Sequence, residues 1–203
     1  MVMAKALILL AAVFQIAPAY GESLLIDDFQ GSPVVNRLGN RANVFLRAPS
    51  KAMVSRREEV INGTRMQVLL LRYEKLNQGG PFNSGGWCGY YTLLKSPKND
   101  GFDARGYEAV TFWVRGEGGH ENFAVGLADR HWNRIGDSVK SQGIGAYLPA
   151  GKMTTQWQKA TIALSEFYVD LSQLFSVAIV FEGDLYPGGG QRGTVYLSDI
   201  AFE

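Results

Sequence analysis

The sequence has few of the residues that carry most metal and nucleophile chemistry. It contains one cysteine, Cys88, and two histidines, His120 and His131. One cysteine permits no intramolecular disulfide, and we interpret Cys88 as a small buried residue of a strand. Neither histidine has a second His or Cys at a spacing typical of zinc sites. There is no Gly-x-Ser-x-Gly motif, although the carboxylates are numerous enough that a glycosidase acid pair stays open. The sequence therefore predicts no catalytic residue, and an enzyme is the least favoured hypothesis.

The sequence also lacks a strong charge of either sign. Its 20 basic and 19 acidic residues give a formal net charge of +1. A surface that binds nucleic acid needs an excess of Lys and Arg, so we expect no nucleic-acid partner. Beyond the first twenty residues no apolar run is long enough to span a bilayer. We therefore expect no membrane insertion after leader cleavage.

The N-terminus has the pattern of a secretory signal peptide. Lys5 supplies the positive charge, residues 6–16 are apolar, and small residues follow up to Gly21. The prediction is a leader over residues 1–21 and one domain over 22–203, in a periplasmic or secreted protein. The alternative is that the apolar run forms an N-terminal helix of the mature fold.

The remaining chain is rich in strand and turn signals. It has 24 glycines and is 12% aromatic, which suits many strands joined by tight turns. Helical turns are expected only near residues 102–105 and 165–174, a polar loop at 131–141, and a hairpin turn at Asn62-Gly63. We read the glycine-rich stretch 77–86 as a connector, because it lacks the Lys-Ser/Thr ending of a phosphate loop. Strands are predicted at residues 24–29, 44–47, 53–60, 64–74, 87–94, 107–115, 122–129, 144–148, 157–164, 175–182 and 194–202.

These segments predict an all-β fold made of two packed sheets. Strands do not alternate regularly with helices, as they would in parallel βαβ units. Residues 64–74 are apolar on both faces, which indicates a central position in a sheet. The first and last strands are similar in character, and we expect them to be neighbours.

Aromatic and planar polar side chains fall on the predicted strands or at their ends. Sugars bury their C–H faces against aromatic rings, and their hydroxyls need fixed donors and acceptors. Such a mixture on one face of a sandwich favours carbohydrate binding, and the alternative is that most of the aromatic residues belong to the core. The set comprises Tyr73, Trp87, Tyr91, Trp113, Arg115, Tyr147 and Glu182.

Five short motifs resemble a known family when they are taken in order. They are LLIDDFQG with NRLG, GWCGYYTLL, YEAVTFWVRGE, WQKATIALSEF and GTVYLSDIAFE. The set resembles the family 11 carbohydrate-binding modules and, more loosely, the complex I intermediate-associated proteins. Both belong to the galactose-binding-domain-like jelly rolls. The resemblance implies a non-catalytic β-sandwich that binds a β-glucan chain on the concave face of one sheet.

The resemblance also implies a set of ligand-binding residues. Trp87 and Tyr91 match the stacking aromatic residues, and Asp137 matches a loop acid that binds hydroxyls together with Arg130. Tyr147 matches a tyrosine at the rim. The strand pattern adds Trp113 and Arg115, giving seven candidate ligand-binding residues.

Related jelly rolls carry a structural Ca²⁺ between their first and last strands, and the resemblance extends to this site. Asp199 matches the ligand on the last strand. Gln30 stands where the family has an acid after the first-strand Phe, so Asp28 must supply the missing charge. The predicted metal ligands are thus Asp28, Gln30 and Asp199, and their alternative role is to cap strand ends in solvent.

Two functional hypotheses remain besides the disfavoured enzyme. The first is an exported, monomeric, non-catalytic module that binds a polysaccharide or glycan. The second is an envelope protein-interaction or assembly factor that uses the same face for a protein partner.

Overall fold

The computed structural model describes residues 23–203 except 33, 78–84, 96–100 and 187–189. The predicted leader and most of the glycine-rich stretch 77–86 lie outside the described residues. Among the helices of the described part, none is long and apolar enough to cross a membrane.

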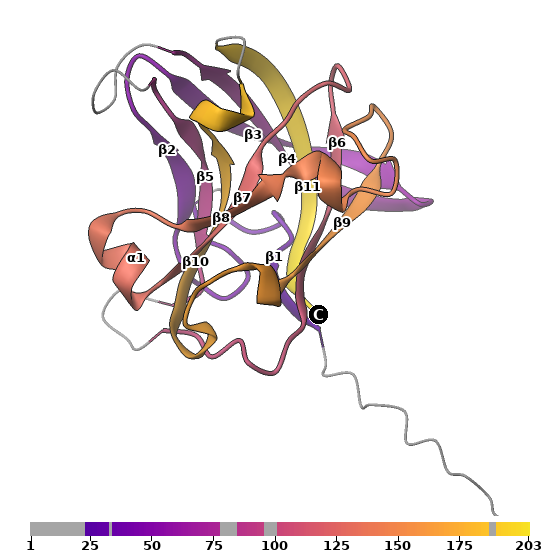
Figure 1. The fold of residues 1–203 in the computed structure, drawn as a ribbon. Coiled ribbons are helices and arrows are strands. Elements are labelled where there is room, and N and C mark those ends of the chain that lie inside the picture. Colours follow the sequence, from indigo (N-terminus) through magenta and orange to yellow (C-terminus); the bar gives the residue numbers. More distant parts are fainter. Residues whose placement is uncertain (1–22, 33, 78–84, 96–100, 187–189) are drawn as a thin grey trace, which may run out of the picture.

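The described residues form two antiparallel sheets that pack against each other (Figure 1). The six-stranded sheet runs β3 (Lys51–Ile61), β4 (Thr64–Lys75), β11 (Gln191–Phe202), β6 (Ala109–Gly116) and β9 (Gln158–Ala163), with β1 (Leu24–Asp27) also paired to β11. The five-stranded sheet runs β2 (Ala42–Leu46), β5 (Cys88–Leu93), β10 (Leu174–Phe181), β7 (Ala124–Asp129) and β8 (Val139–Gly143). The predicted all-β two-sheet sandwich is confirmed.

The strands at the two chain ends lie side by side. Leu24 in β1 pairs with Phe202 in β11, as the sequence predicted. The predicted Asn62-Gly63 hairpin joins β3 to β4, and both residues have positive φ, 49° and 81°. Two positive φ values in a two-residue loop match the twist of the flanking strands, which fixes the register of this long hairpin.

The main core fills the space between the sheets. On β10 the side chains of Val177, Ile179 and Phe181 point inward, and alternate residues point away from the core. Cys88 is fully buried in the same core, and burial raises the pKa of its thiol to about 12. The thiol is therefore unreactive at neutral pH, and the prediction of a small buried cysteine is confirmed.

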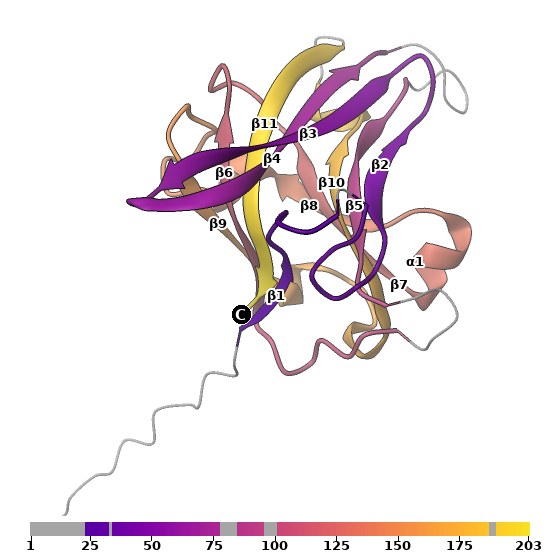
Figure 2. The ribbon, with the colours of Figure 1, turned by 180° about the vertical axis from the view of Figure 1, so that it is seen from behind.

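A second, smaller cluster lies on the outer face of the six-stranded sheet. The far end of the β3–β4 hairpin extends across β11 towards β6 and β9 (Figure 2). Ile61, Val68 and Leu70 of the hairpin are buried there together with Tyr196 of β11. This cover explains why residues 64–74 are apolar on both faces, and the predicted central position of this strand is confirmed, since β4 lies between β3 and β11.

The predicted polar loop at residues 131–141 is wrong. The structure has the helix α1 (Arg130–Ile135) followed by β8. Asp129 caps the helix by accepting a hydrogen bond from the backbone N–H of Trp132 at 3.0 Å, and Gly136 ends it in a left-handed conformation, φ 74°. We missed these two short elements because local capping, not periodicity, defines a helix of six residues.

Two further predictions also need correction. Residues 144–148 do not form a strand, since Ile144–Tyr147 is a 3-10 helix. Residues 102–105 form no helix, because Phe102 instead makes an isolated antiparallel bridge to Leu174. The helical turn predicted at 165–174 is present as two 3-10 segments, Leu164–Glu166 and Leu171–Gln173.

Candidate functional site

The outer face of the five-stranded sheet is hollowed into a cleft of about 1020 Å³. Its floor follows the strand register across the sheet. Tyr91 on β5 lies opposite Ala178 on β10, which lies opposite Gly126 on β7. In the next row Leu93 faces Ser176, which faces Ala128. In these two rows the outward positions on β10 and β7 are therefore small, and those on β5 are large.

Glycine at two positions of this sheet gives room to side chains that line the cleft. A Cβ atom on Gly126 would come within 2.4 Å of the Oγ atom of Ser138, and one on Gly89 within 2.7 Å of the ring of Phe45. Ser138 and Phe45 both line the cleft. The cleft is thus a consequence of which outward residues the sheet carries.

Aromatic side chains form one lip of the cleft. Trp87 precedes β5, Tyr91 lies on β5 and Phe45 lies on the edge strand β2. The guanidinium of Arg47 lies 5.8 Å from the centre of the Trp87 ring. Trp87 and Tyr91 are both partly exposed, so part of each ring is open to a ligand. This lip offers flat apolar surface.

Charged side chains form the opposite wall. Lys140 on β8 donates a hydrogen bond to Asp137 at 2.6 Å and forms an ion pair with Glu182 at 3.5 Å. The αL residue Gly136 turns the chain out of α1 so that Asp137 enters this wall. Burial alone would lower the pKa of Lys140, but the hydrogen bond to Asp137 and the charge of Glu182 outweigh it, and the net pKa is raised. Lys140 is therefore charged at neutral pH and holds both carboxylates in place.

The connection between β1 and β2 completes the rim. Asn36 is buried, and its side-chain amide donates to Thr92 Oγ1 and to the Leu93 carbonyl, both at 2.7 Å. The same side chain accepts from the backbone N–H of Asn40 at 2.9 Å. Asn36 therefore fastens the turn that presents Asn40 and Arg41 to the cleft.

The structure brings together only some of the predicted ligand-binding residues. Trp87, Tyr91 and Asp137 line the cleft. Arg130 lies on α1 and donates to Gln173 at 2.6 Å, and the Tyr147 hydroxyl accepts from the Gln142 N–H at 3.2 Å. Neither Arg130 nor Tyr147 lines the cleft.

The other two candidates, Trp113 and Arg115, lie on the outer face of the opposite sheet. They point outward from β6, because the alternate residues Phe112 and Val114 point into the main core. The face of a strand was predictable here, but the sheet to which it belongs was not. The aromatic residues that we grouped by sequence thus belong to two surfaces.

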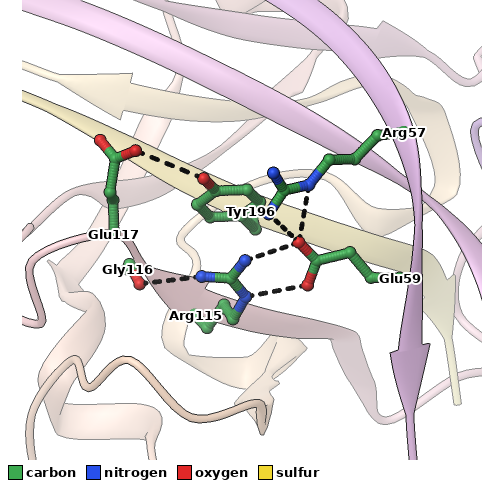
Figure 3. A network of polar contacts seen from close by, with 6 residues as sticks. All are labelled: Arg57, Glu59, Arg115, Gly116, Glu117 and Tyr196. Carbon is green, nitrogen blue, oxygen red and sulfur yellow. Dashed lines mark hydrogen bonds and ion pairs between the residues drawn. The ribbon is translucent and has the colours of Figure 1, made fainter.

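An ion-pair and ring network fills the surface around Arg115 (Figure 3). Arg115 donates to both carboxylate oxygens of Glu59, at 2.6 and 3.1 Å, and its guanidinium lies 3.6 Å from the Tyr196 ring centre. Arg57 lies over the same ring at 4.9 Å and also donates to Glu59. Burial would raise the pKa of Glu59, but the hydrogen bonds from Arg115 and Arg57 lower it below its usual value. Glu59 and both arginines are therefore engaged with one another.

Sequence reasoning missed several residues of the cleft. Their individual signals were weak, because Ser, Ala and Gly are common on strands and a lone Lys or Arg is typical of any surface. Two successive outward positions of the strand at residues 175–182, Ser176 and Ala178, are nevertheless small, which could have indicated a hollow. The missed residues include Asn40, Arg41, Phe45, Asn133, Ser138, Lys140, Ser176 and Ala178.

The predicted metal ligands lie where β1 and β11 meet. The pKa of Asp199 is raised by burial and by the nearby charge of Asp28, so these two carboxylates interact. Asp28 accepts from the Gln30 N–H at 3.1 Å and pairs with Arg37 at 2.8 Å. In the described part of the chain no group of three or more His, Cys, Asp or Glu could hold a metal ion. Two close carboxylates and an amide oxygen fit Ca²⁺ in donor type, while Arg37 already engages one of the carboxylates.

Comparison with known proteins places this geometry in a family. The chain resembles a family 11 carbohydrate-binding module from Clostridium thermocellum in complex with a β-1,3-1,4-mixed-linked tetrasaccharide (14% identity, TM-score 0.60, covering 89% of this chain and 94% of that one). It also resembles a family 30 carbohydrate-binding module (22% identity, TM-score 0.55, covering 89% and 86%). At these identities the likeness shows the fold, and it confirms the jelly-roll β-sandwich. A search of the curated proteins found no match.

The family itself is shown by a sequence-family model. The model for carbohydrate binding domain 30 matches residues 40–203, which is most of the chain. The resemblance to carbohydrate-binding modules is thereby confirmed, whereas the looser resemblance to complex I intermediate-associated proteins stays a prediction. The chain belongs to the carbohydrate binding domain 30 family and is a non-catalytic carbohydrate-binding module.

Proposed function

We propose that the cleft on the five-stranded sheet is the glycan-binding site, and that this sheet face is the concave face expected from the sequence. One observation carries the proposal: small residues form a floor between an aromatic lip and a charged wall. A sugar chain needs this combination, since its C–H faces pack on rings and its hydroxyls bond to fixed polar groups. Of the seven predicted ligand-binding residues, Trp87, Tyr91 and Asp137 are the ones we assign to it.

The charged wall suits hydroxyl groups. Asp137 and Glu182 can accept hydrogen bonds from a sugar, and Lys140 can donate one while it keeps its charge. No group has to change its protonation state on binding. The ligand class that we propose is a polysaccharide of neutral sugar units, and the family 11 module solved with a mixed-linked tetrasaccharide suggests the first probe.

Calorimetric titration with the β-1,3-1,4-mixed-linked tetrasaccharide tests the site. We expect Trp87→Ala to weaken binding by about 30-fold or more, because a buried aromatic anchor typically carries about 2 kcal/mol or more at an interface. Trp113→Ala is the matched control, since Trp113 is an equally large, partly exposed ring on the opposite sheet. It should bind as the unmodified protein does.

Two results would overturn the assignment. Equal affinities for Trp87→Ala and the unmodified protein would show that the cleft is not the site. If the protein does not bind this tetrasaccharide and no neutral polysaccharide of a panel retards it in affinity electrophoresis, the alternative of an envelope protein partner is favoured. Co-purification of one stoichiometric protein from the envelope would then favour the second hypothesis.

We also propose that the module is exported to the periplasm or secreted, and that it acts as a monomer. The N-terminal pattern of charge, apolar run and small residues supports export. N-terminal sequencing of the protein recovered outside the cytoplasm should find Glu22 first, and an uncleaved Met1 would contradict the predicted leader. Light scattering at micromolar concentration should give the mass of one chain.

A further inference from the structure

A second hollow of about 610 Å³ lies at the end of the six-stranded sheet, away from the cleft. This volume falls within the range of about 300–1,000 Å³ that is typical of small-ligand sites. Residues of β3, β4 and β11 line it together with the connection from β6 to β7. None of its lining residues lines the cleft.

The carboxylates of this hollow already have donors. Glu121 is buried and accepts from three backbone N–H groups, those of Gly118, Gly119 and His120, at 2.6 to 3.1 Å. Glu74 pairs with Lys51 at 3.1 Å. Glu117 lies 3.5 Å from the hydroxyl of Tyr196, which donates to it (Figure 3).

Two arginines of the hollow are in the opposite situation. Arg72 on β4 and Arg192 on β11 are exposed, and among the described residues neither side chain has a hydrogen bond or an ion pair. Arg72 lies opposite Thr194, and Arg192 lies opposite Glu74, so the two arginines are diagonal neighbours on one ladder. Diagonal positions are about 7 to 8 Å apart, which lets two guanidinium groups reach the same acid group.

We propose that this hollow is a second ligand site, which takes an acidic sugar unit. The carboxylate or sulfate of that unit would bind Arg72 and Arg192, because planar guanidinium groups match such oxyanions in charge and geometry. Its hydroxyl groups would bond to Glu74 and Glu117, which line the same space and whose carboxylates can each accept a further hydrogen bond. The mixed lining suits a sugar that carries both an acid group and hydroxyls better than a simple anion. The module would then hold a neutral chain on one face and an acidic glycan on the other.

The two sites differ in their expected response to salt. Exposed guanidinium groups attract an anion through solvent, and 1 M salt shortens the screening length to about 3 Å. Binding in the second site should therefore weaken strongly between 0.05 and 1 M NaCl, whereas stacking of a neutral sugar in the cleft should hardly change. Salt thus separates the two sites without any substitution.

The experiment uses the mature protein and three probes: trigalacturonate, a sulfated disaccharide and the neutral mixed-linked tetrasaccharide. We expect an acidic probe to bind, each of Arg72→Gln and Arg192→Gln to weaken it about tenfold, and the double variant to abolish it. The first two probes distinguish a carboxylate from a sulfate as the preferred group. Arg65→Gln is the matched control, since Arg65 is an exposed arginine on the same strand that does not line the hollow and pairs with Glu58 at 3.6 Å. It should leave binding unchanged.

Three results would overturn the proposal. They are no binding of either acidic probe at millimolar concentration, an unchanged affinity in the double variant, or loss of acidic-probe binding in Trp87→Ala. The cleft assignment fails on a different result: Trp87→Ala would bind the neutral tetrasaccharide as the unmodified protein does. That result does not involve the acidic probes or the two arginines.

Discussion

The outer faces of the two sheets have similar residues and different shapes. Each carries aromatic rings, arginines and carboxylates. On the five-stranded sheet the central strand β10 presents Ser176 and Ala178, and the face is hollow there. On the six-stranded sheet the central strand β11 presents Tyr196, and the guanidinium groups of Arg57 and Arg115 both lie over its ring (Figure 3).

The difference shows that composition does not make a binding face. Tyr196 is only 4% exposed, because the long β3–β4 hairpin crosses the sheet and supplies Arg57 and Glu59 to cover it (Figure 2). No hairpin of that length covers the five-stranded sheet among the described strands, and its rings remain open. A face can bind a ligand only where its rings and polar groups stay accessible. Here that depends on the outward residues of the central strand and on whether a hairpin covers them.

Filling the floor of the cleft should have the largest effect. Ala178→Phe places a ring at the middle of the sheet face, directly opposite Tyr91, where the neutral chain is proposed to lie. Tetrasaccharide affinity should fall by about 100-fold or more, which corresponds to about 2.7 kcal/mol. The side chain points away from the core, so the thermal midpoint should change little.

Ala178→Ser is the control, because it adds one oxygen atom and keeps the floor low. It should retain binding. If Ala178→Phe still binds normally, the hollow is not where the ligand lies, and the contrast between the two faces has no functional meaning.

Removing the buried amide of Asn36 should have the next largest effect. Asn36→Ala leaves the Leu93 carbonyl and Thr92 without their donor, and the free energy of unfolding should fall by about 2 kcal/mol. Because Asn36 also holds the turn that presents Asn40 and Arg41, tetrasaccharide affinity should fall severalfold as well. Chemical denaturation and titration measure the two effects separately.

The control for Asn36 is Thr92→Val, which removes one of its two acceptors and leaves the turn attached to the Leu93 carbonyl. We expect a smaller loss of stability and an affinity close to normal. A full loss of stability without any change in affinity for Asn36→Ala would show that the rim does not contact the ligand.

The sequence predicted the architecture because alternation and turn chemistry are local. The Asn62-Gly63 hairpin, the pairing of the terminal strands and the alternation of β6 all followed from short segments. The candidate site was only half predictable. Trp87 and Trp113 were both predicted on strands or at their ends, but the sheet to which each strand belongs depends on pairings between residues far apart in the chain. Asn36 carried no local signal either, since its partners Thr92 and Leu93 lie 56 and 57 residues away.

On the six-stranded sheet, Glu59→Gln should destabilise the protein without changing tetrasaccharide affinity. The neutral amide weakens two charge-assisted contacts, to Arg115 and Arg57, and we expect the free energy of unfolding to fall by about 1 to 2 kcal/mol. A changed affinity would mean that the two faces are coupled, which the comparison above does not allow.

The pH dependence gives a second check on Glu59. Its pKa in the folded protein is lower than the usual value of 4.5, so its contribution is fully present above that value and is lost as the pH falls through the folded pKa. The stability difference between the unmodified protein and Glu59→Gln should therefore be constant near pH 7 and shrink below about pH 4.5. A difference that stays constant down to pH 3 would contradict the charge-based explanation.

The smallest effect concerns the edge where β1 joins β11, for which we propose a structural Ca²⁺ held by Asp28, Gln30 and Asp199. At a free calcium concentration ten times the Kd, calcium binding adds about 1.4 kcal/mol to the stability of the folded state. This raises the thermal midpoint by about 3 to 5 °C for a chain of this size.

Asp199→Asn should abolish this shift. In a chelator it should instead raise the midpoint slightly, because burial and Asp28 raise the pKa of Asp199 and its charged form therefore opposes folding at neutral pH. Tetrasaccharide affinity should be the same with and without calcium. Equal midpoints with calcium and with chelator would leave Asp28 paired to Arg37 alone and would refute the proposed ion.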